Sequence, residues 1–130
     1  MTTKISYVTA FIAGLGLIFI GTRFLLAPEI AEAGYGIHFN EEGNYSFHYI
    51  KGIRDIFSGL LMCVFPLMNE RRALGVMLLA GTMIPITDML IVLSKSYNGV
   101  LQAMPHITAI IICFVIGIIL LVAKPQKKAQ

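Results

Sequence analysis

The sequence predicts an all-α integral membrane protein, a four-helix bundle with its N- and C-termini in the cytoplasm. Of its 130 residues, 57% are hydrophobic and 13% are charged, about half the charged fraction of an average soluble domain. Four segments have the length of about 20 residues that a crossing requires. In lipid these segments must be helices, because an open sheet edge would leave backbone groups unpaired. The length fits one domain, 1–130, with spans at 5–26, 49–68, 73–93 and 104–123.

Basic residues gather at the N-terminus, the second connection and the tail, which a four-span topology places on one side of the membrane. They are Lys4, Arg71, Arg72, Lys124, Lys127 and Lys128. The positive-inside rule makes that side cytoplasmic. The net charge of +3 is too small for a nucleic-acid footprint. The expected partner is therefore the lipid bilayer, and the expected location is the cell membrane.

The first span is expected to be retained and not cleaved as a signal peptide, because its apolar run is longer than a signal core. Ala10 and Gly14 are small residues that let a neighbouring helix approach closely. The same spacing leaves a homo-oligomer open. Arg23 lies about one turn from the outer end, and Pro28 ends the helix.

Residues 27–48 form the long external connection. Its first part, 27–37, predicts a short surface helix ended by Gly34, and the rest mixes aromatic with polar residues that suit the headgroup layer. The connection is long enough to form a lid over the bundle, and an ordinary interfacial loop is the alternative. Tyr35 and His48 are its candidate ligand-binding residues.

The second span opens on charges that must lie at membrane depth, because the apolar run that follows them is too short to cross a bilayer alone. Lys51, Asp55 and Gly59 recur every four residues and share one stripe. Small residues such as Gly59 are enriched where one membrane helix contacts another. Asp55, on the same stripe, is therefore predicted to point into the bundle. Lys51 and Asp55 are spaced to pair, while Arg54 lies about 100° around the helix.

The third and fourth spans each bring one ionisable residue to the same end. Asp88 follows Pro85, whose missing N–H frees the carbonyl of Gly81. The fourth span is predicted to begin near Met104, with its proline in the first turn. His106 lies above a stripe of small residues and is expected to face inward.

Helix geometry places these ionisable residues within about 3–9 Å of the outer helix ends. The main hypothesis is a polar pocket near the outer leaflet that binds a lipophilic or amphipathic small molecule. Asp88 and His106 would supply acid–base groups, with arginines as clamps for an anionic or carbonyl group. Whether the protein is an enzyme stays open. The candidate ligand-binding residues are Arg23, Lys51, Arg54, Asp55, Tyr35 and His48.

Two charge balances and two other functions remain open. Either the arginines hold Asp55 and Asp88, or Lys51 pairs with Asp55 and an arginine reaches Asp88. One alternative function is a non-catalytic structural or assembly protein in which a buried salt-bridge network sets helix register, and the other is a small proton-coupled transporter. Zinc is disfavoured because the candidate ligands lack a tight spacing, and no cofactor motif is present. Those zinc candidates are His38, Glu41, Glu42 and His48.

The chain resembles a domain-of-unknown-function family of small four-span membrane proteins. The matching segments are Gly21-Thr22-Arg23-Phe24-Leu25-Leu26-Ala27-Pro28, Gly34-Tyr35-Gly36-Ile37, Lys51-Gly52-Ile53-Arg54-Asp55-Ile56-Phe57-Ser58-Gly59 and Ile84-Pro85-Ile86-Thr87-Asp88, with His106. The resemblance implies four helices with a polar cluster at one end and implies no reaction. The chain is also similar in size to small multidrug transporters, but their essential acid lies in the first helix, which contains none here. Coupled efflux would have to use Asp88.

Overall fold

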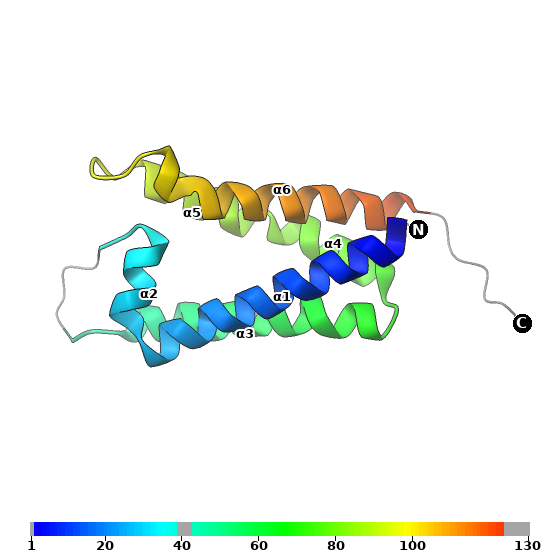
Figure 1. The fold of residues 1–130 in the computed structure, drawn as a ribbon, viewed down its shortest axis with the longest axis horizontal. Coiled ribbons are helices and arrows are strands. Elements are labelled where there is room, and N and C mark those ends of the chain that lie inside the picture. The colour runs from blue at the N-terminus through cyan, green and yellow to red at the C-terminus, as the bar shows by residue number, and fades with distance from the viewer. Residues whose placement is uncertain (1, 39–42, 124–130) are drawn as a thin grey trace, which may run out of the picture.

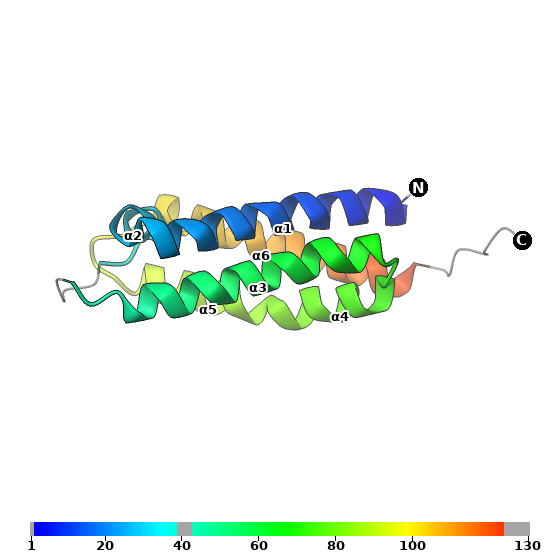
Figure 2. The ribbon, with the colours of Figure 1, turned by 90° about the horizontal axis from the view of Figure 1, so that it is seen from below.

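The computed structural model describes residues 2–38 and 43–123, and every regular element within them is a helix. The elements are α1 (Thr2–Leu26), α2 (Pro28–Tyr35), α3 (Ser46–Leu67), α4 (Arg71–Gly81), α5 (Met83–Leu93) and α6 (Val100–Val122). The helices α1, α3, α4 with α5, and α6 run along the long axis, and α2 lies across one end (Figures 1 and 2). We call this the α2 end. At the opposite end, the terminal end, α1 begins and α6 ends.

Three of the described helical segments are long and apolar enough to cross a membrane: Thr3–Leu26, Arg71–Leu93 and Val100–Val122. The remaining predicted span, α3, is not among them; its first half carries Lys51, Arg54 and Asp55. Large apolar side chains also stay exposed on the outside of the bundle, Phe19 and Phe57 at 63% each. Such surfaces suit lipid better than water, and together with the three long helices they indicate a membrane protein.

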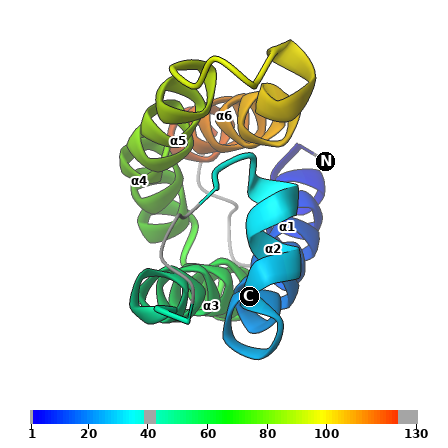
Figure 3. The same cartoon turned by 90° about the vertical axis from the view of Figure 1, so that its left-hand side faces the viewer.

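The long helices pack as two pairs, α1 with α3, and α4–α5 with α6 (Figure 3). Glycines allow the first pair to approach closely. A Cβ on Gly14 would lie 2.7 Å from the carbonyl oxygen of Gly59, and a Cβ on Gly21 would lie 2.5 Å from that of Gly52. The small residues of the first span therefore serve a contact inside the chain. Toward the terminal end the two pairs close on a core formed by Ala10, Met62, Leu74, Leu78, Ile116 and Leu120.

The helix that follows α1 ends later than predicted. It runs to Tyr35, and Gly36, not Gly34, adopts the left-handed conformation (φ 88°) that caps it. The next helix begins at Ser46, so His48 belongs to α3 and not to the external connection.

The predicted beginning of the fourth span was also wrong. α6 begins at Val100, where the Gly99 N–H donates to the Gln102 side chain at 2.9 Å. Pro105 therefore lies inside the helix and not in its first turn. In the third predicted span the helix is interrupted between Gly81 and Met83, close to Pro85, whose missing N–H was expected to free the Gly81 carbonyl.

Arg71 ties the terminal end together. Its Nη1 donates to the carbonyl oxygen of Leu120 at 2.6 Å and also to that of Ala123, which places a cation at the C-terminal end of α6. We expect Arg71→Ala to lower the free energy of unfolding by about 1–3 kcal/mol, because charged hydrogen bonds to carbonyls left by the helix end are lost. Denaturation in detergent measures this. Arg72→Ala removes an exposed neighbouring cation, and an equal effect of that control would contradict the account.

Candidate functional site

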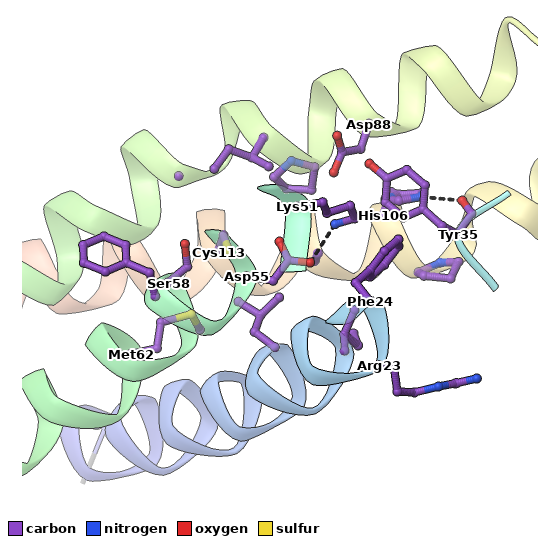
Figure 4. A pocket seen from close by; sticks show the side chains of 18 of the residues that line it. Arg23, Phe24, Tyr35, Lys51, Asp55, Ser58, Met62, Asp88, His106 and Cys113 are labelled. Carbon is purple, nitrogen blue, oxygen red and sulfur yellow. Dashed lines mark hydrogen bonds and ion pairs between the residues drawn. The ribbon is translucent and has the colours of Figure 1, made fainter. Parts of the chain in front are cut away.

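A cavity of about 450 Å³ lies between the two helix pairs toward the α2 end and receives side chains from all six helices. Most of its lining is apolar, so the predicted polar pocket is an apolar chamber with ionisable groups at one end (Figure 4). The apolar lining includes Leu17, Ile20, Phe24, Phe57, Leu61, Met77 and Ile84. The predicted site residues that line it are Arg23, Tyr35, Lys51, Asp55, Asp88 and His106.

Lys51 and Asp55 form a buried ion pair on α3. The Lys51 Nζ lies 2.7 Å from Asp55 Oδ2, and the two side chains are 5% and 9% exposed. The same Nζ lies 5.0 Å from the ring centre of Phe24 and 4.5 Å from that of Tyr35. Aromatic faces attract a cation. The ammonium is therefore held by one carboxylate and two rings, contributed by α1, α2 and α3.

Tyr35 joins α2 to the helices on the other side of the cavity. Its hydroxyl points toward the carboxylate of Asp88 (Figure 4). Burial, and then the Asp88 carboxylate, raise the pKa of Tyr35 well above its ordinary value. The phenol therefore stays protonated, with its hydroxyl directed at the carboxylate. His106 on α6 makes two contacts with Tyr35. The two ring centres lie 4.9 Å apart, and His106 Nε2 lies near the backbone carbonyl oxygen of Tyr35.

The His106 contact also defines which ring nitrogen carries a proton. Nε2 lies 3.3 Å from the carbonyl oxygen of Tyr35. Because a carbonyl only accepts hydrogen bonds, Nε2 must be the donor. The imidazole thus holds the C-terminal end of α2 against α6.

Further contacts fasten α2 and the residues after it. His48 Nε2 lies 2.9 Å from Glu32 Oε2, Asn98 donates to the carbonyl of Gly36, and the His38 N–H donates to the Tyr97 hydroxyl. The helix therefore lies across the end of the bundle over which the connection was expected to fold, and its role as a lid stays a prediction.

Three predicted site residues lie outside this arrangement. His48 is buried against α2 and does not line the cavity. Arg54 is 43% exposed and lies 4.0 Å from Asp55, outside the lining. Arg23 belongs to the lining, but its side chain is exposed and its guanidinium points away from the ionisable groups, 6.0 Å from the Phe19 ring (Figure 4).

The two arginines therefore do not act as clamps in this structure. Within residues 2–38 and 43–123, no lysine, arginine or histidine nitrogen lies within ion-pair distance of Asp88. Both predicted charge balances are wrong about this carboxylate. The predicted Lys51–Asp55 pair is present at 2.7 Å, and Arg54 makes a longer contact of 4.0 Å with Asp55. The physical reason is that long basic side chains can turn their heads toward a polar surface while their stems stay on the helix.

The described part of the chain contains no group of three histidine, cysteine, aspartate or glutamate side chains placed to hold a metal ion. Glu41 and Glu42 lie outside the described residues. Sequence reasoning missed Phe24. Its signal was one aromatic residue at the end of an apolar helix, and its place opposite Lys51 depends on how α1 and α3 are aligned.

The comparisons give one match, and it supports the predicted resemblance. Neither the curated proteins nor the solved structures contain a match. A family model described as "Domain of unknown function" (DUF4267) matches residues 14–120, a range that includes every residue lining the cavity. The chain belongs to this family of unknown function.

Proposed function

We propose that this is a four-span protein of the cell membrane whose cavity binds a lipophilic or amphipathic small molecule. One observation carries the proposal: an apolar chamber of about 450 Å³ ends on Lys51, Asp55, Asp88 and His106. Small-molecule sites are about 300–1,000 Å³ in volume, mostly apolar, with a few polar groups that orient the ligand. An amphiphile has the same division into a long apolar part and a polar head.

Two observations support four spans with cytoplasmic termini. The 22 residues of α3 reach about 33 Å at 1.5 Å per residue, and Lys51 and Asp55 are turned away from lipid. The terminal end also carries Lys4, Arg71 and Arg72, which the positive-inside rule assigns to the cytoplasmic side. The α2 end and the cavity would then lie toward the outer leaflet.

The ligand would enter from the lipid. Phe57 on α3 and Ile84 on α5 both line the cavity, yet they are 63% and 39% exposed. We therefore place the entrance among these exposed apolar side chains. An alkyl tail could lie there while the head reaches the polar end.

The geometry favours binding over acid–base catalysis. The Nε2 proton of His106 is directed at the Tyr35 carbonyl, and the Asp88 carboxylate faces the Tyr35 hydroxyl. Both candidate catalytic groups therefore hold α2 in place. Asp88 and His106 remain the residues that we propose for proton transfer if the bound molecule is converted.

A structural role is the second candidate, and the close Lys51–Asp55 pair favours it. A 2.7 Å pair that is almost fully buried can set the register of α3 without any ligand. A proton-coupled transporter is less well supported, because the described core toward the terminal end is apolar and offers no polar route onward.

Filling the cavity tests the binding proposal. Gly81 lines the cavity, and a Cβ there would meet nothing within 4 Å, so Gly81→Leu places a side chain in open space. Gly16→Leu is the matched control, since Gly16 is exposed, equally unobstructed and outside the lining. We expect purified wild type and Gly16→Leu to carry an amphiphile that mass spectrometry detects, and Gly81→Leu to lose most of it. Equal recovery from all three proteins would contradict the proposal.

A further inference from the structure

We propose that the molecule bound in this cavity carries a cationic head group, an ammonium, that pairs with Asp88. The inference rests on the proposed function and names the class of ligand. It goes against the sequence-based expectation of an anionic or carbonyl group held by arginines.

The charges that face the cavity do not balance. Asp55 and Asp88 supply two carboxylates, while Lys51 supplies one ammonium, already paired with Asp55 at 2.7 Å. Arg23 is part of the lining, but its guanidinium points away from the cavity, and Arg54 lies outside the lining. A carboxylate at membrane depth is costly unless it has a partner. A ligand cation would complete the balance, and an anionic head would increase the excess of negative charge.

The free capacity of Asp88 fits such a head. The Tyr35 hydroxyl is directed at Asp88 (Figure 4), and an ionised carboxylate has about four acceptor positions on its two oxygens. The chain itself shows how an ammonium is held here, because Lys51 Nζ lies between a carboxylate and the rings of Phe24 and Tyr35. The ligand ammonium would occupy a second position of the same kind, at Asp88 beside Tyr35.

Three photoreactive probes that differ only in the head group test this inference. They are dodecylamine, dodecanoate and dodecanol with a diazirine in the chain, presented to the full-length protein in vesicles of zwitterionic phosphatidylcholine. Peptide mass spectrometry then maps the labelled residues. We expect dodecylamine to label the cavity lining at concentrations about ten- to a hundredfold lower than the other two probes. This is the gain in affinity that a hydrogen bond between charged groups provides.

Two variants test whether Asp88 is the residue that causes the preference for the amine probe. Asp88→Asn keeps the shape of the side chain and removes its charge, so the advantage of the amine should disappear. Glu70→Gln removes one negative charge at the exposed turn before α4 and should leave the preference intact. The comparison of head groups in the wild type needs no variant, so it decides the question even if Asp88→Asn does not fold.

The outcomes separate this inference from the function on which it rests. Equal labelling by all three probes, blocked by Gly81→Leu, would overturn the cationic head and leave binding in place. Stronger labelling by dodecanoate, or an amine preference that survives in Asp88→Asn, would also overturn it. Labelling of no cavity residue by any probe would overturn both proposals.

Discussion

Asp55→Asn is expected to lower the free energy of unfolding by about 3–5 kcal/mol, because it leaves the Lys51 ammonium buried without its counter-charge. The two side chains are 5% and 9% exposed and 2.7 Å apart, so water cannot replace the lost partner. Denaturant or thermal unfolding in detergent measures the effect. Arg54→Met is the control; its guanidinium is 43% exposed and 4.0 Å from Asp55, and its loss should cost no more than about 1 kcal/mol.

The double variant Lys51→Met/Asp55→Leu should recover most of that stability, because apolar residues often replace a buried ion pair without loss. It also distinguishes the two proposed roles of the pair. If the pair only sets helix register, the stable double variant should retain its amphiphile. If the pair orients a ligand, the amphiphile should be lost from a folded protein. A double variant as unstable as Asp55→Asn would contradict the assigned ion pair.

Two alanine substitutions only two residues apart are expected to have opposite effects. A Cβ at Gly14 would lie 2.7 Å from the backbone oxygen of Gly59, which cannot move without separating α1 from α3. Gly14→Ala should therefore destabilise the protein by about 1–3 kcal/mol. At Gly16 a Cβ meets nothing within 4 Å, so Gly16→Ala should be neutral or stabilise by up to about 1 kcal/mol through helix propensity.

Unfolding measurements on both variants in one detergent check this pair of effects. An equal loss of stability at both positions would mean that glycine is needed for a reason other than the α1–α3 contact. A stable Gly14→Ala variant would contradict the alignment that brings Phe24 and Lys51 together.

The long helices could be predicted because apolar runs of sufficient length have no alternative in lipid. The positions of the helix ends depended on finer signals. Gln102 follows Gly99 by three residues, and its side chain accepts a hydrogen bond from the Gly99 N–H. This cap lets α6 begin at Val100, four residues before the predicted start near Met104. Likewise the cap of α2 depended on which of two nearby glycines, Gly34 or Gly36, takes the positive φ.

The candidate site was predictable only as far as helix periodicity reaches. The four-residue spacing from Lys51 to Asp55 gives their pairing and their common inward face. The same reasoning could not orient Arg23 or Arg54, because the end of a long side chain is several rotatable bonds from its backbone. Nor could it place Tyr35 against Asp88, since that contact depends on how α2 crosses the end of the bundle.

The most direct test of ligand binding is a high-resolution density map of the protein in lipid nanodiscs. We predict elongated density, not accounted for by the chain, that runs along the apolar lining beside Phe57 and Ile84 to the carboxylate of Asp88. A cavity of the present shape that holds only water, or one filled by the protein's own side chains, would contradict the account.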